Sequence, residues 1–306
     1  MKVLVATEKP FAPVAIRQIR QIIEAAGYQF SLLENYTDPS QLVEAVSDAD
    51  GLIVRSDLVT SRIIEGAKKL RIVVRAGAGY DNLDLAACTA HNVIAMNTPG
   101  QNSNAVAELV FEMILYQIRG GFCGKTGTEL RLKTIGLHAF GNVGKYVADI
   151  AKGFGMDIYA YDPFVSERVM KNNSAKQVTN IDELYRMCQY ISIHLPHNAI
   201  TNKSIGYDLL MKMPPNAVLI NTARKELIDE EGLLRIFEER PDFCYLSDVA
   251  PDCKTTLAEK YKGRFIFTEK KMGAQTEEAN INAGAAAARQ VVEYFKSGNE
   301  KYRVNK

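Results

Sequence analysis

The sequence predicts an α/β protein with two doubly wound parallel sheets. Short β-branched runs alternate with amphipathic helical stretches along the chain, a pattern typical of parallel sheets that helices cover on both faces. The runs form an early and a late series, separated by Asn97-Thr98-Pro99-Gly100, where proline and glycine interrupt the periodicity. The chain of 306 residues is long enough for two globular domains.

The early series predicts the first sheet. We expect its strands at residues 3–6, 29–33, 51–54, 72–75 and 93–96. Between the first two strands, residues 13–26 are expected to form a helix, because isoleucines at 16, 19, 22 and 23 repeat at helical spacing.

The late series predicts the second sheet. We expect its strands at residues 134–138, 157–161, 190–194, 217–221, 245–249 and 265–268. A helix is expected before this series, at residues 106–119. A last helix is expected at residues 276–297, where the run Ala285 to Ala288 allows close packing.

Composition narrows the classes of partner. The 37 basic side chains nearly balance the 36 acidic ones, so no overall field recruits nucleic acid or a membrane, and a small molecule is the expected partner. The five cysteines form no CxxC pair, so we expect reduced thiols and no metal site. The N-terminal apolar run VLVA is too short for a signal peptide, which favours the cytoplasm.

The segment TIGLHAFGNVGKYVADIAKGFGMDIYAYDP, residues 134–163, is typical of a dinucleotide-binding unit. A strand, a glycine turn, a helix and a second strand follow in order, and Asp162 ends the second strand. Gly141 would let the backbone approach a pyrophosphate, and Gly144 would let the helix pack closely. Amides near Asn142 and Val143 would face the phosphates. The charge of Asp162 favours NAD over NADP, and Ala139 stands where such turns usually begin with glycine.

With this motif, the chain resembles the NAD-dependent D-2-hydroxyacid dehydrogenases. The resemblance covers nearly the whole chain and rests on segments in the family's order: VRSDLVT (54–60), VRAGAGYDNLDL (74–85), NTPGQNSNAVAEL (97–109), GTELRLKTIG (127–136), ISIHLP (191–196), LINTARKELIDEEGLL (219–234), SDVAP (247–251) and GAQTEEA (273–279). It implies a Rossmann NAD-binding domain at 98–274. It also implies a flavodoxin-like substrate domain at 1–97, completed by residues 275–306, with the ligands between the domains. A homodimer through the NAD-binding domain is expected.

The resemblance also implies hydride transfer at C2 of a 2-hydroxy acid, and the similarity is greatest to members that oxidise 3-phosphoglycerate, the first step of phosphorylated serine biosynthesis. Two alternatives stay open: a smaller acid such as glycerate or lactate, and a non-catalytic protein that senses NAD. Arg224 matches the family's catalytic arginine, which holds the substrate carboxylate. Asp248 matches the residue that binds the nicotinamide carboxamide. The expected cofactor residues are Gly141, Asn142, Val143, Gly144, Asp162, His194, Leu195, Pro196, Thr222, Ala223, Arg224 and Asp248.

One replacement distinguishes this chain from the family. Lys271 aligns with the family's acid/base histidine, and Cys253 aligns with the glutamate that pairs with that histidine. The ordinary pKa of lysine, about 10.4, must be lowered by burial and positive neighbours before lysine can serve as an acid/base, so losing a close carboxylate suits the exchange. We expect Lys270 and Arg224 to supply the positive charge and Asp252 to orient Lys271.

Substrate-binding candidates follow the strands of the first sheet. The amides of Ala76 and Gly77 are expected to take a carboxylate, and arginines near them a phosphate. The candidates are Arg55, Ser56, Arg75, Ala76, Gly77 and, by resemblance, Asn102.

Overall fold

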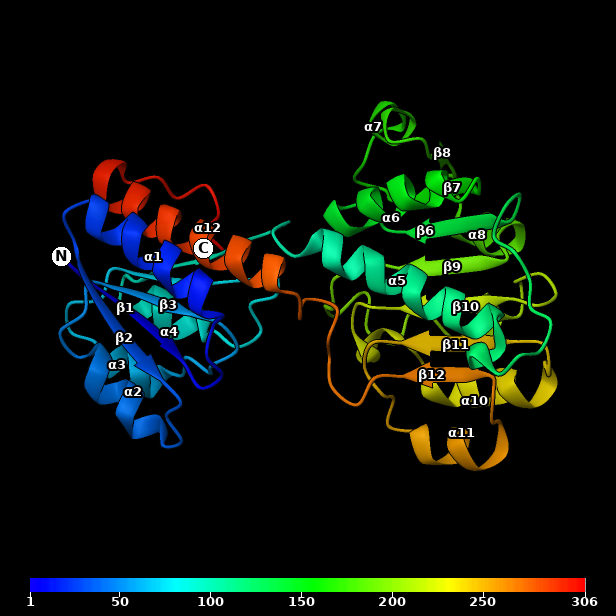
Figure 1. Ribbon diagram of the computed structural model, residues 1–306, viewed down its shortest axis with the longest axis horizontal. Helices are drawn as coiled ribbons and strands as arrows, with labels where there is room; N and C mark the ends of the chain where they lie inside the picture. The colour runs from blue at the N-terminus through cyan, green and yellow to red at the C-terminus, as the bar shows by residue number, and fades with distance from the viewer. Residues whose placement is uncertain (306) are drawn as a thin grey trace. The chain divides into compact units, whose positions relative to one another are not determined.

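The computed structural model describes residues 1–305 and forms two compact units (Figure 1). The first unit contains Met1–Asn102 together with the chain from Gln275 onward, and the second contains Ser103–Ala274. The sequence places the first boundary after residue 97, whereas the structure places it after residue 102. Both place the second boundary between residues 274 and 275.

The first unit is a five-stranded sheet in which every pair of neighbours is parallel. Its order is β2-β1-β3-β4-β5, the flavodoxin-like order that the sequence predicts. The strands are β1 (Lys2–Thr7), β2 (Gln29–Glu34), β3 (Gly51–Val54), β4 (Ile72–Arg75) and β5 (Ile94–Asn97). The central strand β3 is buried along its whole length, because helices cover both faces of the sheet.

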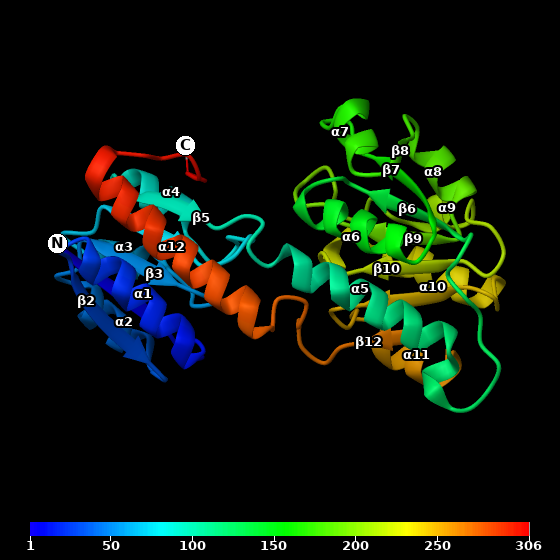
Figure 2. The same cartoon turned by 45° about the horizontal axis from the view of Figure 1, so that its top comes forward.

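The helices of this unit include the last helix of the chain, which Figure 2 shows beside the first helix. They are α1 (Pro13–Ala25), α2 (Pro39–Val46), α3 (Ser61–Gly66), α4 (Leu85–Ala90) and α12 (Glu277–Ser297). The hydroxyl of Thr276 caps the start of α12, and Gly298 ends it with a φ of 71°. A Cβ on Gly284 would lie 2.7 Å from Cδ1 of Ile19, so a small residue is required where α12 packs on α1.

The second unit is a seven-stranded parallel sheet in the order β12-β11-β10-β9-β6-β7-β8. The strands are β6 (Thr134–His138), β7 (Asp157–Tyr161), β8 (Lys176–Gln177), β9 (Tyr190–Ile193), β10 (Val218–Asn221), β11 (Cys244–Ser247) and β12 (Phe265–Phe267). This order contains the Rossmann arrangement and confirms the predicted fold class. Sequence reasoning missed β8, because its two polar residues carry no strand pattern.

The second unit's helices alternate with these strands. They are α5 (Ser103–Ile118), α6 (Asn142–Gly153), α7 (Glu167–Asn172), α8 (Ile181–Met187), α9 (Tyr207–Leu210), α10 (Glu230–Glu239) and α11 (Lys254–Lys260), with short 3-10 turns η1 (Gly120–Phe122) and η2 (Lys225–Leu227). Strand order reverses between β6 and β9, as it does between β1 and β3 in the first unit. Ligands of doubly wound sheets bind at the carboxyl ends of strands at such switch points.

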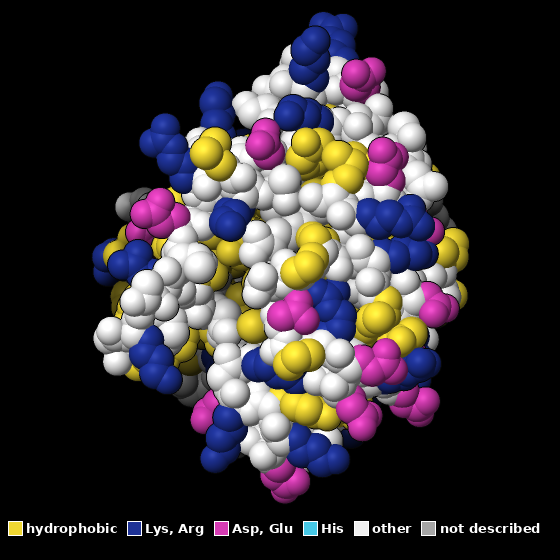
Figure 3. Space-filling model, turned by 90° about the vertical axis from the view of Figure 1, so that its right-hand side faces the viewer, with side chains coloured by type: hydrophobic (Ala, Val, Ile, Leu, Met, Phe, Trp, Pro, Cys, Tyr) yellow, Lys and Arg dark blue, Asp and Glu magenta, His cyan; other side chains and the backbone are white. Residues whose placement is uncertain are grey.

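The surface is mixed in charge. On the face drawn in Figure 3, Lys and Arg side chains are interspersed with Asp and Glu side chains, in keeping with the near balance of charge in the sequence. Within residues 1–305, no helix has the length and apolar character needed to cross a bilayer.

Candidate active site

The glycine turn after β6 joins that strand to the N-terminus of α6. Gly141 is the N-cap residue, and no side chain caps this end of the helix. A Cβ on Gly141 would meet no atom within 4 Å, so the backbone is open to a close approach there. A Cβ on Gly144 would lie 2.8 Å from the carbonyl oxygen of Ala139, so only glycine lets α6 pack against the turn. Asn142 is exposed and Val143 is half-buried.

Ala139 begins this turn with a φ of 78°. The left-handed region costs an L-residue with a Cβ roughly 1–2 kcal/mol, which glycine would not pay. Alanine in place of glycine at position 139 is therefore a source of local strain. This strain lies in the turn that is expected to bind the dinucleotide.

The carboxylate of Asp162, at the end of β7, is bound to the same turn. Its Oδ2 accepts a hydrogen bond from the amide of Phe140 at 2.8 Å, and its Oδ1 accepts one from the amide of Phe164 at 2.9 Å. Each oxygen keeps a further lone pair for a ribose hydroxyl. The role of Asp162 in holding the turn was not apparent from the sequence, because it depends on parallel pairing between β6 and β7.

Two histidines lie at the switch point of this sheet. Burial lowers the pKa of His138 to about 4, against a smaller opposing effect of Asp162, and Nδ1 of His138 lies 3.1 Å from the hydroxyl of Tyr185. Burial, and secondarily His138, lowers the pKa of His194 to about 3. His194 and Leu195 are half-buried, and Pro196 is exposed.

A buried asparagine shapes the turn after β10. The Oδ1 atom of Asn221 accepts from the amide of Ala223 at 3.0 Å, and its Nδ2 donates to the carbonyl oxygen of Arg224 at 2.9 Å. Nη1 of Arg224 donates to the carbonyl oxygen of Ala223 at 3.0 Å. Sequence reasoning did not select Asn221, although an asparagine at the end of a strand is a known signal for such side-chain turns.

Lys271 reaches this same turn from the segment after β12. Its Nζ donates to the carbonyl oxygens of Thr222 at 3.0 Å and Ala223 at 2.6 Å, and lies 3.9 Å from Oδ2 of Asp248. Its side chain is 42% exposed. The sequence predicts that the family's glutamate is lost and that Asp252 orients Lys271. The structure places Asp248 near the amine instead, because β11 is the neighbour of β10 and Asp248 directly follows its last residue, Ser247.

Asp248 is fully buried and holds the segment that carries Lys271. Its Oδ1 accepts from the amide of Met272 at 2.8 Å, and its Oδ2 accepts from the amide of Gly273 at 2.9 Å. A Cβ on Gly273 would lie 2.8 Å from Oδ2, so glycine is needed for this contact. One amide binds each carboxylate oxygen, which leaves Oδ2 a further lone pair, and the binding of a nicotinamide carboxamide by Asp248 stays a prediction.

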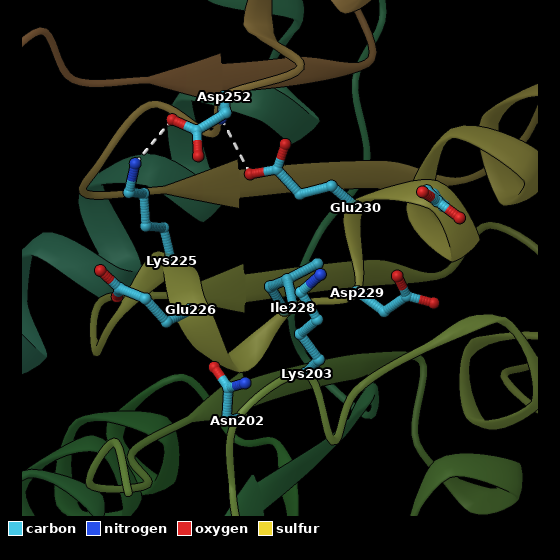
Figure 4. Close-up of a pocket in the computed structure, with 9 residues that line it drawn as sticks. Asn202, Lys203, Lys225, Glu226, Ile228, Asp229, Glu230 and Asp252 are labelled. Carbon is cyan, nitrogen blue, oxygen red and sulfur yellow. Dashed lines mark hydrogen bonds and ion pairs between the residues drawn. The ribbon is translucent and has the colours of Figure 1, made fainter. Parts of the chain in front are cut away.

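Asp252 does not take the orienting role expected for it. Its carboxylate accepts from Nζ of Lys225 at 2.6 Å, and its amide donates to Glu230 at 2.8 Å, as Figure 4 shows. The side chain is 79% exposed, at the edge of a cavity of about 280 Å³ that also adjoins Lys203 and Asp229. Adjacency to position 253 in sequence therefore did not make Lys271 the partner of Asp252.

The first unit brings two of the expected substrate residues together. Nε of Arg75 donates to the carbonyl oxygen of Arg55 at 2.9 Å, which links the ends of β3 and β4. Ser56 is exposed and Asn102 is half-buried.

The expected use of the Ala76 and Gly77 amides is corrected by the structure. The amide of Ala76 donates to the carbonyl oxygen of Val54 at 2.8 Å, and the amide of Gly77 donates to that of Arg75 at 2.9 Å. Both amides are thus engaged within the turn and do not face a carboxylate.

The second unit fits a dinucleotide on several counts. The backbone is open at Gly141, and α6 begins there with uncapped amides. Among the described residues, Oγ1 of Thr222 and Nε2 of His194 are buried polar atoms without a hydrogen-bond partner in the protein. Such atoms are costly unless a ligand or water satisfies them.

Residues 111–260 match the family model for the D-isomer specific 2-hydroxyacid dehydrogenase, NAD binding domain. The chain is 34% identical over 265 residues to a D-3-phosphoglycerate dehydrogenase of Methanocaldococcus jannaschii, covering 82% of this chain and 51% of that protein. It is 34% identical over 219 residues to a hydroxypyruvate reductase of Thermotoga maritima, covering 67% of this chain and 70% of that protein. The chain thus spans about half the length of the D-3-phosphoglycerate dehydrogenases that it matches.

Among solved structures, the chain is similar to the NAD+-bound 3-phosphoglycerate dehydrogenase of Entamoeba histolytica. The TM-score is 0.91 at 49% identity, and the match covers 100% of this chain and 99% of that one. The apo D-lactate dehydrogenase of Escherichia coli shares the fold, with a TM-score of 0.82 at 19% identity over 99% of this chain and 100% of that one.

Proposed function

This chain belongs to the D-isomer specific 2-hydroxyacid dehydrogenase family, and on that premise we propose that it oxidises 3-phosphoglycerate at C2, with NAD as hydride acceptor. The product is 3-phosphohydroxypyruvate, and the reaction is reversible. In this proposal the seven-stranded unit binds NAD and the five-stranded unit binds the substrate.

The observation that carries the proposal is the position of Lys271. Its amine is hydrogen-bonded to the turn that also carries Arg224, so a proton carrier and a carboxylate-binding cation belong to one rigid piece of the second unit. The side chain of Asn221 is hydrogen-bonded to the backbone of Ala223 and Arg224 in that turn. The amine of Lys271 and the guanidinium of Arg224 are therefore attached to one fixed stretch of backbone. Catalysis of hydride transfer needs such a pair on one substrate.

Each group has a distinct chemical task. NAD, when bound, would supply the acceptor for the hydride of C2. The guanidinium of Arg224 holds the substrate carboxylate through two parallel hydrogen bonds. The neutral amine of Lys271 accepts the hydroxyl proton, so that C2 becomes a carbonyl carbon; in the reverse direction the ammonium returns that proton. Gly141, Asn142, Val143 and Asp162 would hold the dinucleotide.

The phosphorylated substrate is supported by the pair of arginines in the first unit. Burial lowers the pKa of Arg55, and Asp57 opposes that effect, so Arg55 is a partly desolvated cation. Arg75 is linked to it by a backbone carbonyl. Two guanidinium groups at neighbouring strand ends suit a phosphate dianion. Lactate has no phosphate group for them to bind.

A substrate panel tests the proposal. Initial rates with NAD would be measured for 3-phosphoglycerate, glycerate and lactate, each over a range that gives kcat/KM. We expect kcat/KM to be highest for 3-phosphoglycerate. Equal or higher values for glycerate or lactate would contradict the substrate, and no turnover with any of the three, alongside normal NADH binding, would favour a non-catalytic NAD-sensing protein.

A homodimer in the cytoplasm is part of this proposal. The cytoplasmic location is supported by the absence of disulfides among the cysteines of residues 1–305. The dimer is supported by Phe122, which is 71% exposed and packs edge-on against Tyr116 at the end of α5. Light scattering checks it: a mass near that of one chain, 34.0 kDa, would contradict the dimer.

A further inference from the structure

A buried carboxylate connects three loops at the carboxyl edge of the five-stranded sheet. That carboxylate is the side chain of Asp57, a residue that is only 4% exposed. Its Oδ1 accepts from the amide of Glu8 at 2.6 Å and from the hydroxyl of Tyr36 at 2.7 Å, and its Oδ2 accepts from the amide of Arg55 at 3.2 Å. These donors follow β1, β2 and β3 respectively, so one side chain fixes the ends of three adjacent strands.

Asp57 lies where the topology of this sheet leaves room for a ligand. The strand order reverses between β1 and β3, and doubly wound sheets bind ligands at the carboxyl ends of the strands at this point. A carboxylate is costly to bury unless donors satisfy it. Three donors do so here, and all of them come from loops at that edge rather than from the body of the sheet.

The network of Asp57 extends to both arginines of the proposed phosphate site. Asp57 holds the backbone amide of Arg55, and the carbonyl of Arg55 accepts from Nε of Arg75 at 2.9 Å. Nη2 of Arg55 donates to Oε1 of Gln275 at 2.6 Å. The guanidinium of Arg75 folds over Gly77, where an added Cβ would lie 1.6 Å from Nη1. The guanidinium of Arg75 is therefore held by the backbone of Arg55, which Asp57 fixes, and the guanidinium of Arg55 is held by the side chain of Gln275.

We propose that Asp57 is a positioning residue that gives this protein its selectivity for a phosphorylated 2-hydroxy acid. It touches no substrate. It holds Arg55, and through the Arg55 carbonyl it holds Arg75, in the arrangement that a phosphate needs before the substrate arrives. Ordering two long side chains in advance removes that entropic cost from binding. This inference rests on the proposed function, because it concerns the substrate class of the same site.

The Asp57→Asn variant tests the inference. It keeps the size of the side chain, yet its NH2 group would face one of the present donors instead of accepting from it. The measurements are kcat/KM for 3-phosphoglycerate and for glycerate at saturating NAD, together with the Kd for NADH and the Tm. We expect the selectivity ratio to fall about tenfold, chiefly through a higher KM for 3-phosphoglycerate, as a loss of preorganisation of this size would give. The Kd for NADH and the rate with glycerate are expected to stay the same.

A milder variant covers the case in which Asp57→Asn does not fold. Tyr36→Phe removes one of the three donors and leaves the carboxylate in place, so the ratio is expected to fall by about threefold. Tyr28→Phe is the matched control, because it removes a tyrosine hydroxyl from the same unit at a ring that packs against Phe295. That control should keep the wild-type ratio.

The outcomes separate the inference from the proposed function. A wild-type protein without preference for 3-phosphoglycerate would overturn both. A wild-type preference that survives unchanged in Asp57→Asn, or in Tyr36→Phe where the first variant is unfolded, would overturn the positioning role alone. Equal losses with both acids would also overturn it, because a purely structural role lowers both rates together.

Discussion

Nζ of Lys271 lies 3.9 Å from Oδ2 of Asp248, and the two side chains differ greatly in exposure, at 42% and 0%. The carboxylate is bound by the amides of Met272 and Gly273, directly after the lysine. Asp248 therefore holds the backbone directly after the lysine and lies within ion-pair distance of its amine. The family's acid/base pair uses a histidine and a glutamate, whereas here an amine lies beside a buried aspartate.

Lys271→Arg is expected to abolish turnover while leaving the Kd for NADH unchanged. Arginine keeps the charge and the hydrogen bonds to the turn but does not release a proton at working pH. Loss of general acid/base catalysis corresponds to about 10²- to 10⁴-fold in kcat. Steady-state rates and NADH fluorescence titration check this, and wild-type turnover with normal NADH binding would remove Lys271 as proton carrier. Lys262→Ala, at an exposed position in the same unit, serves as the control.

Asp248→Asn is expected to move the acid-side, rising limb of the pH–rate profile for substrate oxidation to lower pH. A nearby negative charge favours the ammonium form of a lysine, so neutralising the carboxylate lets the amine lose its proton more readily. The profile of kcat would be measured from pH 6 to pH 10. An acid-side limb that stays in place would show that Asp248 does not act on the amine at 3.9 Å.

Ala139→Gly is expected to raise stability by about 1 kcal/mol, because glycine adopts the φ of 78° without the steric cost that alanine bears. For a unit of this size that corresponds to about 2–4 °C in Tm. The matched control is Ala148→Gly in the middle of α6, where glycine should destabilise by about 1 kcal/mol or more. Thermal unfolding of both variants decides the matter, and a lower Tm for Ala139→Gly would contradict the assigned strain.

Stability is expected to fall between pH 7 and pH 5, in part because of His138. Its pKa of about 4 in the folded protein lies below the unfolded value of about 6.5. The unfolded chain therefore binds the proton first, and the stabilisation present above pH 6.5 is lost as pH falls towards 4. Between pH 7 and pH 5, the free energy of unfolding of His138→Gln should fall by about 2 kcal/mol less than that of the wild type, as measured by urea unfolding. The control is His91→Gln, at an exposed helix end, whose free energy of unfolding should fall as much as that of the wild type.

Much of the fold could be predicted because it follows local rules. Alternating β-branched runs and amphipathic stretches predict both sheets, and Thr276 and Gly298 mark the two ends of α12 as capping chemistry requires. The two-residue strand β8 could not be predicted, because it exists only through its pairing with β7. Gly144 could likewise be predicted from spacing, since the need for a small residue there lies within one turn and one helix.

The side-chain partnerships could not be predicted in the same way. Asp252 was expected near Lys271 from adjacency in sequence, yet it pairs with Lys225. No local sequence pattern marks Asp57 or Asn221, although each organises a turn at a strand end. The partners of these residues depend on strand order and strand register. A local sequence pattern predicts neither of these.

The sequence by itself determined the fold class, the dinucleotide motif and the exchange of histidine for lysine, because periodicity, glycine spacing and residue identity are properties of short stretches. Only the tertiary structure decided that Lys271 has a buried carboxylate for a neighbour and that the Ala76 and Gly77 amides are already engaged. Parallel strands that are remote in sequence bring their carboxyl ends to one edge, so the charge next to a residue is set by strand order rather than by its neighbours along the chain.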